Sequence, residues 1–274
     1  MTDFNIPTVT MGDGCSIPQL GFGTFKMPAE DTERSVSAAL EIGYRHIDAA
    51  SAYANETEVG AAIAASGIPR DQLFITTKLW RDSHLPDDAK AAIHTSLEKL
   101  GVDFVDLYLI HWPATVHFGD LYIGAWDCLQ EFKREGLATS IGVSNFHGGN
   151  LDALRGEVPA INQVELHPTF AQVPLRAEMA RRGISVQAWS PLGRSADLTH
   201  PTTLRIADAT HRPPAQVLLR WHMQSGLIAI PKSVTEARIA ENFQIFDFEL
   251  TAEQMAEIDA MDAHNRVGTD PANV

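Results

Sequence analysis

The chain has 274 residues and carries 35 acidic against 21 basic side chains, which gives a formal net charge of −14 at pH 7. This charge argues against nucleic acid or an anionic membrane surface as the main partner, although it leaves room for a local basic pocket. Cys15 and Cys128 lack metal or redox spacing and indicate free thiols in a reducing compartment. Residues 1–5 begin no signal-peptide pattern, and no apolar run reaches the roughly 18 residues of a membrane span, so we expect a cytoplasmic protein.

The predicted elements alternate along the chain. Residues 9–17 are expected to form a β-hairpin that turns at Gly12-Asp13-Gly14 and closes the bottom of a barrel. The short apolar runs that we interpret as strands cover residues 20–23, 46–48, 73–78, 105–110, 140–143, 161–164, 184–189 and 227–230. Such runs, separated by segments of helical length, indicate βαβ units and a parallel sheet. Eight of them without a linker favour a single domain over residues 1–274, an α/β protein with a closed (β/α)8 TIM barrel.

Helix signals lie between the strands. Helices are predicted from about Asp31 to Gly43 and from Asp87 to Leu100, and others are predicted to end at residues 135–136 and 182–183, where a glycine stops each of them. A Pro-Pro pair at 213–214 separates two further helical stretches. Another helix is predicted to begin near residue 235.

Four polar residues coincide with the predicted strand ends. Asp48, Lys78 and His111 each stand at the end of an apolar strand, and Tyr53 lies on the loop after Asp48. Because a dry, unpaired charge is costly, we expect these side chains to meet one another. Barrel enzymes have their active sites at the carboxyl ends of the strands, so all four are expected at one mouth.

This combination is suited to handling a proton. The hydroxyl of a free tyrosine has a pKa of about 10, too high for acid-base work at neutral pH. A lysine ammonium beside Tyr53 is expected to lower that pKa, and Asp48 is expected to keep the lysine charged. A neutral His111 can then donate to a carbonyl oxygen, so the group has the parts that protonate a developing alkoxide. Taken singly, Lys78 and Asp48 also allow a structural ion pair, and His111 a strand cap.

Three motifs resemble the signatures of the aldo-keto reductases. They are residues 43–50 followed by Tyr53 and Asn55-Glu56, residues 137–146, and residues 230–234 followed by Arg238 and Glu241-Asn242. The resemblance runs from about residue 8 to about residue 270. It is strongest to the prokaryotic branch that contains 2,5-diketogluconate reductases and methylglyoxal reductases.

The resemblance implies a (β/α)8 barrel that binds NADPH without a Rossmann domain and reversibly reduces aldehydes and ketones. It implies that Tyr53 is the general acid, that Lys78 and Asp48 tune it, and that His111 orients the substrate carbonyl. The expected activity is therefore that of an NADPH-dependent aldehyde and ketone reductase.

Residues after the last predicted strand indicate the phosphate site. Lys232 and Ser233 precede a predicted helix whose first turn contains Arg238, where the helix dipole disfavours a cation. Unless Arg238 pairs with Glu236 or Glu241, the helix N–H groups and the arginine are expected to bind an anion together. A surface Arg–Glu pair of little energetic worth is the alternative. The resemblance places the 2′-phosphate of NADPH on these positions, which favours NADPH over NADH.

The rest of the cofactor site is predicted on other loops. Residues 21–26 contain only half of a G-x-G-x-x-G pattern and lack the acidic residue of a Rossmann fold. Trp189 is placed to stack on the nicotinamide, and Thr24 to contact its ribose. Residues 190–194 are expected to follow the pyrophosphate, with Arg194 either in contact or exposed. The other predicted cofactor residues are Gly23, Asp48, Ser144, Asn145, Gln163, Ser190, Leu192 and Val234, with Glu241 and Asn242 at the adenine edge.

Aromatic residues are expected to ring the mouth. Phe25, Trp80 and Trp112 follow predicted strands, and with His111 they are predicted to bind the substrate, although tryptophans near strand ends are often core residues. The loop at 114–124 and the tail at 265–271 are both short. This predicts an open site and broad specificity toward small aldehydes and dicarbonyls.

Other classes of function stay open. Lys78 acting as a Schiff-base nucleophile would give a lyase that needs no nicotinamide. A chain that binds NADPH with little turnover would be a redox sensor or regulatory protein. Metal-dependent hydrolysis needs clustered ligands, for which His46 and Asp48 are the only tempting pair. The sequence does not identify the physiological substrate, and a monomer is expected mainly from the resemblance.

Overall fold

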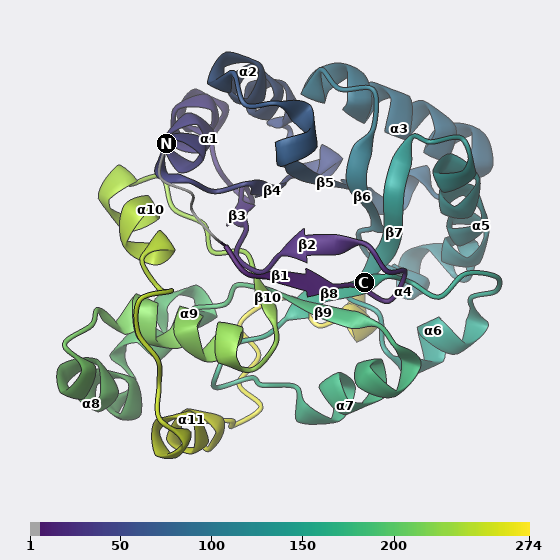
Figure 1. The fold of residues 1–274 in the computed structure, drawn as a ribbon. Helices are drawn as coiled ribbons and strands as arrows, with labels where there is room; N and C mark the ends of the chain where they lie inside the picture. Colours follow the sequence, from purple (N-terminus) through teal and green to yellow (C-terminus); the bar gives the residue numbers. More distant parts are fainter. Residues whose placement is uncertain (1–5) are drawn as a thin grey trace.

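Eight parallel strands form one curled sheet surrounded by helices (Figure 1) in the computed structural model, which describes residues 6–274. Leu20, just before the first barrel strand, makes a parallel bridge to Ala229 of the last, so the sheet closes and the predicted TIM barrel is confirmed. Residues 1–5, from which the absence of a signal peptide was predicted, lie outside the described part. The strands, in the order in which they pair, are β3 (Phe22–Gly23), β4 (His46–Asp48), β5 (Phe74–Leu79), β6 (Val105–Ile110), β7 (Ala138–Ser144), β8 (Ile161–Glu165), β9 (Ser185–Trp189) and β10 (Ile228–Ala229).

The helices lie between the strands, and the four whose ends the sequence predicts end within a residue or two of those positions. Gly101 and Gly183 follow their helices with left-handed φ values of 67° and 71°, the conformation that a residue without a Cβ adopts at lowest cost. In residues 6–274 no helix is both long and apolar enough to cross a membrane. The helices are α1 (Ala29–Ile42), α2 (Glu56–Ser66), α3 (Pro86–Leu100), α4 (Thr115–Phe118), α5 (Leu121–Arg134), α6 (Gly148–Ala153), α7 (Val173–Arg182), α8 (Pro201–Thr210), α9 (Pro214–Gln224), α10 (Glu236–Phe243) and α11 (Ala252–Asp259).

The predicted amino-terminal hairpin is present. Strands β1 (Thr8–Thr10) and β2 (Ser16–Pro18) pair antiparallel and lie across one opening of the barrel (Figure 1). Met11 and Ile17 pack on Phe74, Ile161 and Ile228, the residues with which β5, β8 and β10 begin. The hairpin therefore closes the end of the barrel opposite the carboxyl ends of the strands.

The alternation of side chains along each strand sorts the barrel interior into layers. On β5, Phe74 joins the apolar cluster under the hairpin, whereas Ile75 and Leu79 join the outer core beneath the helices. Since successive residues of a strand face opposite sides, Thr76 and Lys78 follow Phe74 into the interior. The interior is thus apolar at the bottom and polar toward the mouth.

Helices α2 and α3 approach each other at Gly60. A Cβ at this position would lie 2.6 Å and 2.7 Å from the carbonyl oxygens of Lys99 and Leu100. Although alanine is the better helix former, Gly60→Ala is expected to lower the free energy of unfolding by about 1–3 kcal/mol, because backbone cannot give way as a flexible side chain can. Chemical denaturation measures the change. Gly124→Ala, on the exposed side of α5 with no atom within 4 Å, is the matched control, and equal stability of both variants would contradict the close packing.

Candidate active site

The four predicted strand-end residues meet at the mouth of the barrel. Lys78 Nζ lies 2.5 Å from Asp48 Oδ1, and it donates to the carbonyl of Ala49 at 2.8 Å and to the hydroxyl of Tyr53 at 3.3 Å. These contacts occupy all three ammonium donors. The ring of His111 stands edge-on to that of Tyr53, with centroids 5.5 Å apart. We refer to Asp48, Tyr53, Lys78 and His111, whose catalytic role is a prediction, as the catalytic group. It is a buried ion pair with a hydroxyl and an imidazole beside it.

Two loop residues that the sequence analysis did not single out for the site hold Tyr53 and its loop in place. A short turn, η1 (Ser51–Tyr53), brings Tyr53 back over β5, and Ser51 Oγ donates to the carbonyl of Lys78 at 2.9 Å. Asn55 Nδ2 donates to the carbonyl of Thr24 at 3.0 Å, which ties the loop after β4 to the loop after β3. Asn55 belongs to the first aldo-keto reductase motif, whereas Ser51 carries no sequence signal beyond a hydroxyl two residues before Tyr53.

Burial controls the protonation of the group. Burial and then the charge of Asp48 raise the pKa of Tyr53 well above its ordinary value, so the expected lowering by Lys78 is wrong for these side chains. The reason is that burial disfavours the charged phenolate and that the Asp48 carboxylate repels it. Burial lowers the pKa of Lys78, and Asp48 offsets this only in part. Burial and then Lys78 lower the pKa of His111 well below its ordinary value, which keeps the imidazole neutral, as predicted.

A chain of amides supports Asp48 from within the barrel. Gln163 Nε2 donates to Asp48 Oδ2 at 2.7 Å and to Gln187 Oε1 at 2.9 Å, and Gln187 in turn lies 3.4 Å from the ring of His46. The sequence analysis assigned Gln163 to the cofactor and missed Gln187. The sequence signal that could have identified Gln187 is its position two residues before Trp189, which places both side chains on the same face of β9.

The residues predicted to face the nicotinamide lie together. Asn145 Nδ2 donates to the carbonyl of His111 at 3.0 Å and to Ser144 Oγ at 3.1 Å, and Asn145 Oδ1 accepts from Trp189 Nε1 at 2.9 Å. Ser144 Oγ donates to the carbonyl of Gln163 at 2.8 Å. Their contacts with a carboxamide stay a prediction.

The predicted phosphate residues surround the start of α10. Ser233 Oγ accepts from the backbone N–H of Thr235, the residue that precedes the helix, at 3.1 Å. Lys232 and Arg238 are exposed, and within residues 6–274 neither has a carboxylate within 4 Å, so the alternative Arg–Glu pair is not formed. The adjoining predicted residues are Val234 and Glu241, which are half-buried, and Asn242, which is buried.

The first and last barrel strands come close together beside this helix. A Cβ at Gly23 would lie 3.0 Å from the carbonyl oxygen of Ile230, so the end of β3 packs tightly on the segment that leads to the predicted phosphate site. Thr24, the next residue, is fully buried, and its Oγ1 donates to the carbonyl of Asp48 at 3.0 Å. Thr24 thereby joins the predicted cofactor residues to the catalytic group.

The segment at 190–194, which is predicted to contact the pyrophosphate, is held in place at its first two residues. Ser190 has a left-handed φ of 50°, and the ring of His222 on α9 lies 2.9 Å from the carbonyl oxygen of Pro191. Leu192 is half-buried, whereas Arg194 is exposed.

Aromatic side chains stand beside the catalytic group. Phe25, which is 44 % exposed, lies 5.1 Å from the ring of Tyr53, and Trp80 lies 5.1 Å from the ring of His111. Trp112 is half-buried next to them in the chain. The predicted loop at 114–124 is largely helical, since it contains α4 and the first turn of α5.

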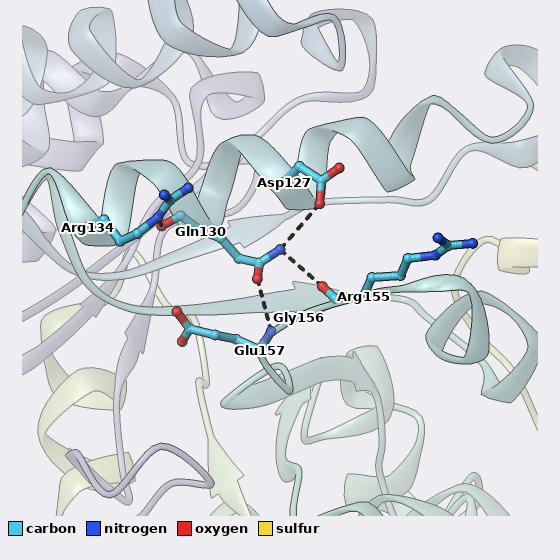
Figure 2. A pocket seen from close by; sticks show the side chains of 6 residues that line it. All are labelled: Asp127, Gln130, Arg134, Arg155, Gly156 and Glu157. Atoms are coloured by element: carbon cyan, nitrogen blue, oxygen red, sulfur yellow. Dashed lines mark hydrogen bonds between the residues drawn. The ribbon is translucent and has the colours of Figure 1, made fainter.

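A surface cleft of about 420 Å³ lies elsewhere, between α5 and residues 155–157 (Figure 2). Gln130 points across it: its amide nitrogen donates to the carbonyl of Arg155 at 3.1 Å, and its Oε1 accepts from the N–H of Glu157 at 2.9 Å. Both ends of the amide are thus used to fasten the loop before β8, and we assign the cleft a structural role.

A (β/α)8 barrel with a lysine joined to an aspartate and a tyrosine at its mouth defines a class of oxidoreductase. A model of the aldo/keto reductase family matches residues 19–263, and the chain belongs to this family. It is 49 % identical over 268 residues to an aldo-keto reductase of Mycolicibacterium smegmatis, covering 97 % of each chain. It is 46 % identical over 271 residues to the methylglyoxal reductase DkgA of Yersinia pestis, covering 97 % of this chain and 96 % of that one. Among solved structures, a Gox0644 variant in complex with NADPH superimposes with a TM-score of 0.93 at 39 % identity, covering 98 % of each chain.

Proposed function

We propose that this protein reduces small aldehydes, ketones and dicarbonyls with NADPH and that Tyr53 donates the proton. The observation that carries the proposal is the position of Lys78, which bonds both Asp48 and the Tyr53 hydroxyl while a neutral His111 lies beside them. The similarity to a methylglyoxal reductase and to a structure that holds NADPH supports the substrate class and the cofactor.

The residues at the mouth suit nicotinamide adenine dinucleotide phosphate. Trp189 is a half-buried indole held by Asn145, which suits it to stack on a flat ring. Lys232 and Arg238 are exposed cations without a carboxylate partner in the described chain, beside the start of α10, which suits an anionic phosphate. NADPH, when bound, supplies the hydride that reduces the carbonyl carbon.

The side chains of the catalytic group manage the charge that develops on the carbonyl oxygen. His111 is neutral and can therefore donate a hydrogen bond that orients the carbonyl. Because burial keeps Tyr53 protonated, its proton is available to the alkoxide when that forms. Lys78 then stabilises the phenolate that is left, and Asp48 is held in place for this by Gln163.

This arrangement disfavours a Schiff-base lyase. Lys78 is fully buried, and its three donors are taken by Asp48, Ala49 and Tyr53, so its nitrogen has no free approach to a carbonyl. The second candidate is a regulatory protein that binds NADPH with little turnover. The assay described next distinguishes it from a reductase.

The proposal is tested by NADPH oxidation with methylglyoxal, phenylglyoxal and 2,5-diketogluconate, each run beside NADH. Turnover with NADPH that exceeds turnover with NADH supports a reductase. Tight binding of NADPH without turnover of any substrate would favour the regulatory candidate. If NADPH neither bound nor reacted, the assignment of the cofactor site would be wrong.

Arg238→Ala is expected to raise the KM for NADPH by roughly tenfold or more and to leave the KM for NADH within about twofold, because a charge-assisted hydrogen bond contributes about 1.5–3 kcal/mol. The reason is that only NADPH carries the 2′-phosphate. Steady-state kinetics with both cofactors measure the effect. Arg181→Ala, an exposed arginine on α7, is the control. An equal rise of both KM values would argue against a phosphate contact.

A further inference from the structure

A buried ion cluster lies at the end of β8, just after Gln163, and has no part in the proton transfer above. Asp197 Oδ2 lies 2.9 Å from Nδ1 of His167, and Glu165 Oε1 lies 3.3 Å from Nε2 of the same ring. All three residues are at most 1 % exposed. We refer to Glu165, His167 and Asp197 as the ion triad. Thr169 completes it by donating from its hydroxyl to Asp197 at 2.7 Å.

The ion triad joins three segments that are distant in the sequence. Glu165 ends β8, and Asp197 begins the turn η5 (Asp197–Thr199), just after the predicted pyrophosphate segment. Glu165 also accepts backbone N–H bonds from Val267 at 2.6 Å and from Gly268 at 3.0 Å, both in the carboxyl-terminal tail. The segment after β9 and the tail are thus both fastened to the end of one barrel strand.

The tail lies directly against Trp189 at this point. A Cβ on Gly268 would overlap the six-membered ring of the Trp189 indole and come within 2.5 Å of the Glu165 carboxylate. On its other side, the indole N–H donates to Asn145. The orientation of Trp189 is therefore limited by Asn145 on one side and by the tail on the other.

We propose that the ion triad positions Trp189 for the cofactor, by holding the tail at residues 267–268 and the segment after β9 against the end of β8. Glu165, His167 and Gly268 are then positioning residues, since they act on the cofactor through Trp189. The proposal rests on the proposed function in one respect, namely that Trp189 stacks on the nicotinamide.

Each ring nitrogen of His167 faces a carboxylate oxygen, and only the charged imidazole can donate to both of them. Burial alone would lower the pKa of His167, but the hydrogen bonds to Asp197 and Glu165 outweigh it and raise the pKa. A raised pKa means that the contribution to stability is complete below the unfolded value and is lost as pH rises through the folded value. Two other charged or titratable groups face the cluster: Arg266 of the tail lies 3.7 Å from Glu165, and His222 of α9 interacts with His167 and Asp197. Arg176 of α7 acts in turn on His222.

The first test compares cofactor binding by Gly268→Ala and Glu165→Gln with that of the unchanged protein and of Gly124→Ala. Quenching of tryptophan fluorescence by NADPH gives the Kd, and kinetics give kcat at saturating NADPH. We expect Gly268→Ala and Glu165→Gln each to raise the Kd about tenfold or more, with kcat at saturation changed by less than about threefold. An unchanged Kd in Gly268→Ala would overturn the proposal. This test remains valid even if Glu165→Gln does not fold.

The second test needs no cofactor and so separates this proposal from the proposed function. Trypsin cleaves after Arg266, one residue before the fastened backbone, and cleavage of the apo protein reports how well the tail is held. We expect faster cleavage in Glu165→Gln and His167→Asn than in the unchanged protein, and faster cleavage of the unchanged protein at alkaline pH, relative to a peptide substrate. Equal rates would contradict the fastening of the tail, whatever the outcome of the NADPH assays.

Discussion

Tyr53→Phe is expected to lower kcat for carbonyl reduction by about 10²- to 10⁴-fold, the range attributed to a positioned general acid. The substitution removes one oxygen, the acceptor of a 3.3 Å bond from Lys78, and it leaves the Tyr53 ring contact with Phe25 intact. Binding of NADPH is expected to be preserved, because none of the predicted cofactor residues bonds to this hydroxyl. Rate measurements at saturating NADPH, with fluorescence titration of the cofactor alongside, give both quantities.

Tyr122→Phe is the matched control, since Tyr122 is a buried tyrosine of α5 that lies outside the catalytic group and packs on Phe146. It is expected to retain kcat. A Tyr53→Phe protein that turned over at the rate of this control would remove Tyr53 from the role of proton donor and shift that role to His111.

Lys78→Met is expected to abolish measurable turnover and to lower the free energy of unfolding by about 3–5 kcal/mol, the cost of breaking a buried ion pair. The ammonium and Asp48 are 0 % and 1 % exposed, so the substitution leaves a dry carboxylate whose remaining partner is Gln163. Urea denaturation and activity assays measure the two effects separately.

The double variant Asp48→Asn with Lys78→Met distinguishes the catalytic from the structural contribution. Removing both charges is expected to restore most of the lost stability, because no uncompensated charge stays buried. Activity is expected to stay absent, since no ammonium is left to stabilise a phenolate at Tyr53. If activity returned together with stability, Lys78 would be a structural residue only.

Much of the barrel could be predicted because its strands are short and its side chains alternate. Once β4, β5 and β6 are identified as parallel strands, Asp48, Lys78 and His111 share one mouth because each lies at a carboxyl end. The period of two then places Lys78 in the barrel interior. The bonds of Lys78 then follow, because a buried ammonium must satisfy its three donors.

The protonation of Tyr53 and the partners of Gln163 could not be predicted in the same way. The balance between burial, which raises the pKa of Tyr53, and the ammonium of Lys78 depends on depth and distance, neither of which a sequence contains. Gln163 and Gln187 lie on neighbouring strands and meet only because of the register between β8 and β9. The ion triad and its bond to the tail connect residues 165, 197 and 267, which lie too far apart along the chain for any local sequence pattern to link them.

The most direct test of the account is a single turnover in which the protein, saturated with NADPH, is mixed with methylglyoxal and the absorbance of the reduced nicotinamide is followed. The account predicts rapid loss of that absorbance in the unchanged protein and a rate lower by at least about a hundredfold in Tyr53→Phe, with the cofactor bound in both. Loss of absorbance at the same rate in the two proteins would contradict the assignment of Tyr53 as proton donor.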